Sequence, residues 1–205
     1  NSKAAELLRP ENSEKLTEKY IREFPHRIYW SEISRYPDLS EELIDDFHDK
    51  VDWKELSQYA ILSEDFIRKF KDKVVWYKIS YHQNLSEEFI REFPHRVDWK
   101  GISTKKLSMD FIREFKDLVN WEQISIWQEL THDNIREFRG CLNWPEIALN
   151  QKLSIDCIRE FKNLLEWEFI SYYQELTPNN IREFRSEVSW MWISKMQKLD
   201  DDFII

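Results

Sequence analysis

The hydrophobic and polar positions of this chain follow one pattern that returns about every 23 residues. The stretch "LSEEFIREFPHRVDWKGIS" (85–103) returns as "LSMDFIREFKDLVNWEQIS" from Leu107 and as "LSIDCIREFKNLLEWEFIS" from Leu153. Such a period is typical of solenoids. The repeats begin at Leu16, Leu39, Leu62, Leu85, Leu107, Leu130, Leu153 and Leu176, and the step is 23 residues except for 22 after Leu85. We predict eight tandem repeats over 16–198, a truncated ninth over 199–205, and an N-terminal cap or repeat remnant over 1–15.

Each repeat carries signals for two short helices. Position 2 is always Ser or Thr, and acidic residues often follow it, as at a helix N-cap with anions in the first turn. Position 14 is often Asp or Asn, a second N-cap, and the Trp at position 15 follows it. Pro25 and Pro94 should end the first helix at Phe24 and Phe93. The pattern predicts an all-α, superhelical α-solenoid with a first helix and a shorter second helix per repeat, stable only when stacked.

The apolar positions 1, 5, 6, 9, 13, 15 and 18 of the repeat supply the predicted core. A tryptophan row at position 15 could in principle stack bases or cage a ligand. Because this tryptophan is present in every repeat, on the same side of the helix as the apolar residue at position 18, we interpret the row as a packing ladder. Its members are Trp30, Trp53, Trp76, Trp99, Trp121, Trp144, Trp167 and Trp190. The Ser at position 19 and the frequent Gln at position 22 are predicted to form hydrogen-bond ladders between repeats.

Composition narrows the classes of partner and compartment. The formal net charge is -9 and the pI about 5.2, which disfavours nucleic acid and anionic membranes, because both select clustered Lys and Arg. Two cysteines are too few for a disulfide framework, and no apolar run reaches the length of a membrane span. We expect a reduced, cytoplasmic protein. Since the sequence starts at Asn1 rather than Met, we also expect it to be processed or trimmed.

No catalytic, cofactor or metal motif is apparent. The glycines, Gly101 and Gly140, form no phosphate loop, and the histidines have no metal-ligand spacing. Cys157 replaces a core Phe, and Cys141 has no predicted base beside it. We therefore predict a protein that is not an enzyme, with no cofactor and no catalytic or metal-binding residue.

An arginine recurs at position 7, opposite the Phe stripe. The row could hold a polyanion or a phosphorylated partner through Arg68, Arg91, Arg113, Arg136, Arg159 and Arg182, with Arg22 in the first repeat. The other interpretation is a surface salt-bridge ladder, because acids precede and follow these arginines. The interleaved acids should cancel the field of the row, which favours the ladder.

The outward positions of the second helix, 16, 17, 20 and 21, change character along the chain. The second repeat has Lys54, Glu55, Gln58 and Tyr59 there. The last four repeats instead carry an apolar strip of Ile126, Trp127, Leu149, Phe169, Tyr172, Tyr173, Met191, Trp192 and Met196. Such a strip is typical of a protein interface. Superhelical curvature could instead bury it between repeats, or truncation at Ile205 could have exposed it.

The phrase "LSEEFIREF", followed by "VDW" and "IS", resembles short tandem helical repeats predicted in bacteriophages and large DNA viruses. In repeat length the chain is also similar to leucine-rich repeat variant solenoids, whose second helix is 3₁₀-like. The resemblance covers residues 16–205 and implies no catalytic motif. From the apolar strip we predict a non-enzymatic module that binds a protein partner, with self-association through the strip as one form. The resemblance implies a viral protein that sequesters a host factor in the host cytosol. The alternative is nucleotide or nucleic-acid sequestration by the arginine row with aromatic stacking.

Overall fold

The computed structural model describes residues 18–197, 199 and 203, and every regular element among them is a helix. The predicted N-terminal segment 1–15 and most of the ninth repeat lie outside the described residues. The chain divides into two compact units, Asn1–Asp98 and Trp99–Ile205. The division falls inside the repeat of 22 residues, between its first and second helices. Within each unit the helices alternate in order, as the solenoid prediction requires.

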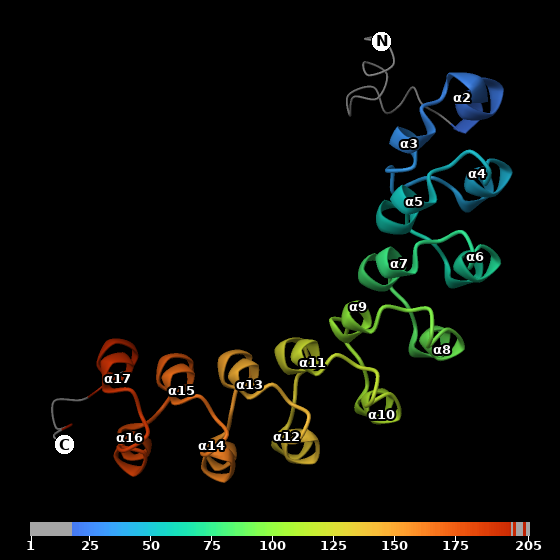
Figure 1. Cartoon of the computed structure of the whole chain (residues 1–205). Coiled ribbons are helices and arrows are strands. Elements are labelled where there is room, and N and C mark those ends of the chain that lie inside the picture. The colour runs from blue at the N-terminus through green and yellow to red at the C-terminus, as the bar shows by residue number, and fades with distance from the viewer. Residues whose placement is uncertain (1–17, 198, 200–202, 204–205) are drawn as a thin grey trace. The chain divides into compact units, whose positions relative to one another are not determined.

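In the first unit, first and second helices form two separate rows (Figure 1). The first helices are α2 (Glu18–Glu23), α4 (Glu41–Asp46), α6 (Glu64–Lys69) and α8 (Glu87–Glu92). The second helices are α3 (Trp30–Ile33), α5 (Trp53–Tyr59) and α7 (Trp76–His82). A short 3₁₀ helix, η2 (Pro25–Arg27), follows α2 at the proline that was predicted to end it.

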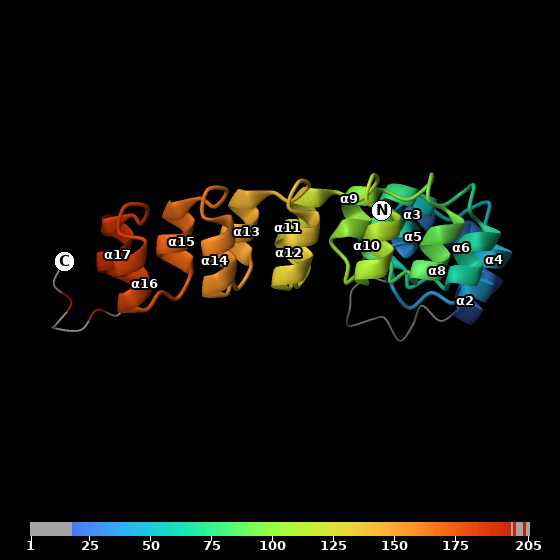
Figure 2. The same ribbon diagram turned by 90° about the horizontal axis from the view of Figure 1, so that it is seen from below.

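The second unit has the same two rows, which Figure 1 shows side by side, and its helices follow one another in order along the row in Figure 2. Its first helices are α10 (Met109–Glu114), α12 (His132–Phe138), α14 (Ile155–Phe161) and α16 (Pro178–Glu183). Its second helices are α9 (Trp99–Ser103), α11 (Trp121–Trp127), α13 (Trp144–Asn150), α15 (Trp167–Tyr173) and α17 (Trp190–Met196). Successive second helices approach one another closely along the row.

The predicted shorter second helix is found only in the first repeat, at α3, and the fourth, at α9, and no described second helix has the 3₁₀ geometry of the similar solenoids. From α11 onward the second helices are α-helices of seven residues, as long as the longest first helices or longer by one. The reason is visible at their ends, where the N–H of the Gln at position 22 still bonds to the carbonyl four residues earlier, as Gln151 does to Ile147. The helix therefore keeps α geometry through its last residue.

Side-chain caps fix the start of the first helices where the sequence predicts it. The hydroxyl of Ser63 accepts the N–H of Phe66, and Ser40, Ser86, Ser108 and Ser154 cap in the same way. Two capping boxes appear in addition, in which an Asn three residues later bonds back to the cap. They join Thr131 to Asn134 and Thr177 to Asn180.

The core is built from the same positions in every described repeat. The isoleucines at position 6 and the apolar residues at position 18 are at most 2% exposed. Trp53 shows the packing of the tryptophan row: its ring lies 4.7 Å from that of Phe70 and 6.3 Å from that of Phe66, both in the next repeat. Its indole N–H donates to the carbonyl of His48 at 2.9 Å. The interpretation of this row as a packing ladder is confirmed.

Two buried polar ladders join neighbouring second helices, as predicted. The Ser57 hydroxyl donates to the Trp53 carbonyl at 2.6 Å and accepts the N–H of Val75, in the next repeat, at 2.9 Å. The Gln83 amide donates to the Ala60 carbonyl at 2.8 Å, and its oxygen accepts the N–H of Leu62 at 3.1 Å. Because these groups would otherwise be buried without partners, the ladders fix the register between repeats.

Candidate interaction surfaces

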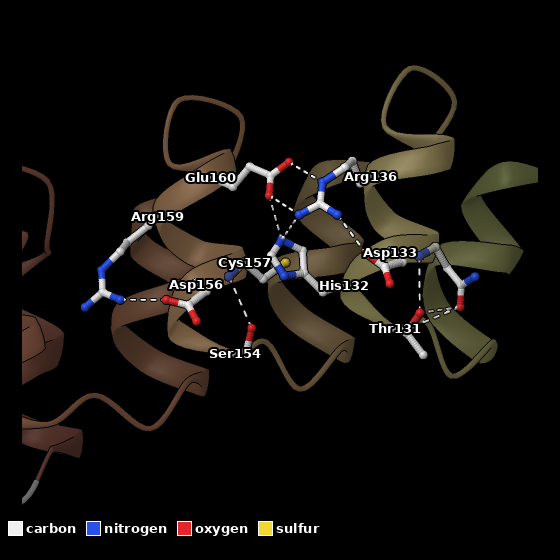
Figure 3. Close-up of polar contacts among 10 residues, drawn as sticks. Thr131, His132, Asp133, Arg136, Ser154, Asp156, Cys157, Arg159 and Glu160 are labelled. Carbon is white, nitrogen blue, oxygen red and sulfur yellow. Dashed lines mark hydrogen bonds and ion pairs between the residues drawn. The ribbon is translucent and has the colours of Figure 1, made fainter.

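The arginines of position 7 form an ion-pair ladder on the exposed side of the first helices. The Arg136 guanidinium donates to Asp133 in the same helix at 2.7 Å (Figure 3). Two of its nitrogens donate to Glu160 in the next repeat, at 2.6 and 2.7 Å. Arg68, Arg113 and Arg159 repeat this arrangement with Glu92, Glu137 and Glu183. At four of the six candidate anion-binding arginines, the charge is therefore already matched by two carboxylates.

The two remaining candidates, Arg91 and Arg182, have local neighbours as well. Arg91 lies within 3.8 Å of Glu87 and 3.9 Å of Glu88. Arg182 donates to Asn179 at 3.2 Å, and its guanidinium lies over the ring of Phe203, 5.0 Å from the centroid. The row as a whole therefore carries its own counter-charges or ring contacts.

One rung of the ladder is inverted. In the second repeat position 7 is Asp45 instead of Arg, and in the third repeat position 8 is Lys69 instead of Glu. Their charged atoms lie 2.6 Å apart, so the pair survives with its polarity reversed. A binding site for a polyanion would lose a positive charge at this exchange, whereas a ladder of ion pairs keeps its pairing. The inversion supports the salt-bridge interpretation.

The ladder holds its carboxyl groups in the charged form. The hydrogen bond from Arg136, together with the smaller effect of His132, lowers the pKa of Glu160 from an ordinary 4.5 to about 2. Hydrogen bonds from Arg68, Arg113 and Arg159 lower the pKa of Glu92, Glu137 and Glu183 in the same direction. A lowered pKa in the folded state stabilises the fold above the unfolded pKa, and the contribution is lost as pH falls toward the folded value.

We therefore expect the stability of the protein to fall between pH 5 and pH 2, and Glu160→Gln to make that fall shallower. The measurement is urea unfolding across this pH range. Glu122→Gln is the matched control, because Glu122 is an exposed acid with no ion pair in the described part of the chain. A control variant with the same shallower slope would contradict the assignment of the effect to the ladder.

The predicted apolar strip lies on the second helices of the second unit, α11, α13, α15 and α17 (Figure 1). Trp127 is 62% exposed, Tyr173 and Met191 are each 51% exposed, and Met196 is 46% exposed. The other five members, Ile126, Leu149, Phe169, Tyr172 and Trp192, are half-buried. Stacking of the repeats therefore covers these five in part and leaves four large apolar side chains of the strip exposed.

Position 20 of one repeat meets position 17 of the next on this face. In the first unit this rung is an ion pair, with Arg35 Nε 2.8 Å from Glu55, and then a hydrogen bond in which Lys78 donates to Gln58 at 2.7 Å. In the last repeats it is aromatic: the rings of Tyr172 and Trp192 are 4.7 Å apart and 82° to each other. The same structural position thus changes from charged to aromatic along the chain.

An aromatic recess lies on α15 and α17. Its walls are Phe169, Tyr172, Tyr173 and Trp192, with Glu168 at its edge, and its volume is about 290 Å³. The Tyr172 and Tyr173 rings are 4.4 Å apart and 54° to each other, and those of Phe169 and Tyr173 are 6.4 Å apart and 60° to each other. The rings are thus inclined to one another rather than stacked flat.

A second recess, of about 500 Å³, lies where α11 and α13 end. Ile126 and Trp127 line it from α11, and Asn150 lines it from the end of α13. The segment after α11 contributes Gln128, Glu129, Leu130 and Thr131, and the segment after α13 contributes Gln151 and Lys152. Trp127, the most exposed aromatic residue of the strip, therefore borders a hollow that also offers amide and charged groups.

Sequence reasoning missed two features of the second-helix face. It compared the apolar strip with the second repeat only and passed over the third, where Tyr77 and Tyr81 of α7 place their rings 4.9 Å apart and Tyr77 is 53% exposed. It also left out Glu168, which stands at position 16 beside the aromatic recess. Tyr at positions 16 and 20 of the third repeat was the sequence signal that could have predicted the exposed aromatic pair on α7. No signal in the sequence predicts the recess, because it depends on the inclination of the rings.

Cys157 lacks the lowered pKa of an activated nucleophile, and the described residues contain no cluster of metal-ligating side chains. Burial raises the pKa of the Cys157 thiol to about 11, the opposite of what activates a nucleophile. Cys141 is a free, exposed thiol. No group of three or more His, Cys, Asp and Glu among the described residues could hold a metal ion. None of the described helices has both the length and the apolar composition needed to cross a bilayer.

Comparison with known proteins finds no matching family model, curated protein or solved structure.

Proposed function

We propose that the protein is a non-enzymatic binding module that captures a protein partner on the second helices of its second unit. The observation that carries the proposal is the exposure of large apolar side chains in one strip, centred on Trp127, Tyr173 and Met191. Trp, Tyr and Met are the residues that interface cores enrich. A partner that presents apolar side chains would bury this strip. The resemblance to viral repeat proteins would make that partner a host protein.

The two faces of the second unit support this choice of surface. Arginines and carboxylates on the first helices satisfy one another across repeats, so a polyanion would have to displace those pairs. In the apolar strip, Trp127 donates its indole N–H to Gln123 and Tyr173 contacts Tyr172, yet more than half of each side chain stays exposed. Burying exposed apolar surface is the main favourable contribution to most protein associations. We therefore assign binding to the second-helix face and do not assign it to the arginine row.

The test is the triple variant Trp127→Gln, Tyr173→Thr and Trp192→Gln. We expect helical content and melting temperature close to those of the parent protein, because two of the three side chains are more than half exposed. Binding of a captured partner should weaken by at least about thirtyfold, the cost of losing a single hot spot of about 2 kcal/mol. Surface plasmon resonance with the purified partner measures the affinity, and sedimentation velocity establishes whether the partner is a second copy of the chain.

A matched control removes exposed apolar residues from another part of the surface. Leu118 and Leu164 are 43% and 47% exposed and lie in the turns after α10 and α14, outside the apolar strip. Leu118→Gln with Leu164→Gln should leave the affinity unchanged. Equal loss of binding in the control and the triple variant would mean that the partner recognises apolar surface in general, and the proposal would be wrong.

A further inference from the structure

The aromatic recess on α15 and α17 has the chemistry of a cation site. We propose that it is an aromatic cage for a quaternary ammonium group, carried by a trimethylated lysine side chain of the protein partner. This inference rests on the proposed function, because it identifies one side chain of the partner that the apolar strip binds. The cage consists of Phe169, Tyr172, Tyr173 and Trp192, with Glu168 at its edge.

The arrangement of the rings is the first argument. The face of an aromatic ring carries partial negative charge, so several faces directed at one space attract a cation. Rings packed flat on one another would hide those faces. Here Tyr172 meets Trp192 edge to face at 82° and stands at 54° to Tyr173, and with Phe169 these rings line one open recess of about 290 Å³. Aromatic rings of different orientation therefore border the same space.

The charge at the edge of the cage is the second argument. Glu168 is exposed, and no ion pair joins it to any residue in the described ranges. This contrasts with Glu137, Glu160 and Glu183 on the other face, each of which pairs with an arginine of the preceding repeat. A carboxylate without a partner beside an aromatic recess complements a positively charged occupant.

The shortage of hydrogen-bond acceptors selects the kind of cation. A guanidinium has five N–H donors and an unmodified ammonium three, and these need acceptors when they are buried. The lining side chains of the recess offer one carboxylate and two tyrosine hydroxyls. A trimethylated ammonium has no N–H group and needs only apolar contact and ring faces. The recess therefore fits the quaternary form better than Arg or unmodified Lys.

The structure also contains a cation on one of these rings. The ammonium of Lys195, in the same helix, lies 5.1 Å from the centre of the Trp192 ring. Lys195 is exposed and does not line the recess. The Trp192 ring thus already attracts one positive charge, and the same residue lines the recess.

The experiment titrates the intact protein with acetylated trimethyllysine amide and follows the tryptophan indole N–H signals by NMR. The neutral control ligand carries a tert-butyl group in place of the trimethylammonium group, so it has the same shape without charge. We expect the charged ligand to shift the Trp192 signal and to bind about three- to thirtyfold more tightly than the neutral one. Equal affinities would overturn the cage, because an apolar groove alone would explain them. Choline is the third ligand: tighter binding of choline than of trimethyllysine would overturn the assignment to a partner side chain.

Variants locate the site. Tyr173→Ala and Trp192→Leu should each weaken trimethyllysine binding by about three- to thirtyfold, and Glu168→Gln should weaken it in the same direction. Tyr59→Ala, which removes an exposed aromatic side chain of α5 outside the cage and outside the apolar strip, should leave it unchanged. Circular dichroism checks that each variant is folded. If Trp192→Leu does not fold, Tyr173→Ala still tests the cage, because Tyr173 is exposed. Unchanged affinity in Tyr173→Ala and Glu168→Gln would overturn the cage.

The test of the cage and the test of the proposed function can give different answers. The ligand titration needs no protein partner, so it tests the cage directly. A partner that binds with unchanged affinity to Glu168→Gln but loses affinity in the triple variant would uphold the proposed function and overturn the cage as its lysine site.

Discussion

Deleting the whole sixth repeat, residues 130–152, should leave a folded, helical and shorter protein. Every ladder can rejoin across the deletion, because the flanking repeats carry equivalent residues. Trp121 would meet Phe161 as it now meets Phe138, and Arg113 would meet Glu160 as it now meets Glu137. In a solenoid stability is close to a sum over repeats and their interfaces, so the loss of one repeat is a limited loss.

Deleting only residues 142–152 should have a far larger effect. This change removes α13 and with it the Trp144 contact to Phe161 and the hydrogen bonds of Gln151. It also leaves the Gln174 amide without the carbonyls of Ala148 and Gln151. A loss of about 5 kcal/mol or more would lower the melting temperature by roughly 10 to 20 °C. Circular dichroism melts of both deletions decide the matter, and equal destabilisation by the two would contradict the repeat-by-repeat account.

The fold was predictable because local signals and the period agree. Ser and Thr at position 2 cap the first helices, and the isoleucines at position 6 are buried in every described repeat. The tryptophan recurs in every repeat and the Ser at position 19 and Gln at position 22 in most of them, because a residue that an interface needs is needed at the same position of each repeat. The length of the second helix was not predictable, because it depends on backbone bonds at its C-terminus that no residue type there requires.

The interaction surfaces were predictable only in part. Sequence placed the apolar strip on the correct helices, since outward positions follow from helical periodicity. It could not give the exposed fraction, which ranges from half-buried at Tyr172 to 62% exposed at Trp127, because that depends on the distance between neighbouring helices. It also took the second repeat as a solvated reference, whereas Glu55 and Gln58 bond to Arg35 and Lys78. Contacts between repeats determine the exposure and the bonds of these side chains, and residue spacing within one repeat does not predict such contacts.

The tryptophan row allows a graded test of packing against ligand binding. Trp99→Ala should lower the free energy of unfolding by about 3 kcal/mol, the low end of the cost of truncating a core aromatic side chain, because Trp99 is half-buried. Its ring lies 4.9 Å from that of Phe115 and 6.2 Å from that of Phe111. Trp127→Ala, which removes an exposed tryptophan of the same unit, should change it by less than about 0.5 kcal/mol. Guanidinium titration followed by circular dichroism measures all variants.

Trp144→Ala should fall between these two. Its ring meets Phe161 at 5.1 Å, but Cys157 stands at position 5, where the third to fifth repeats have a second phenylalanine. One aromatic pair is worth about 0.5 to 1.5 kcal/mol, so Trp144→Ala should cost less than Trp99→Ala by about that amount. Stability unchanged in Trp99→Ala together with loss of partner binding would show that the row is a binding site. The graded order would instead show that the tryptophans of position 15 stabilise the stack, while Trp127 and Trp192, on the outer positions, remain available for binding.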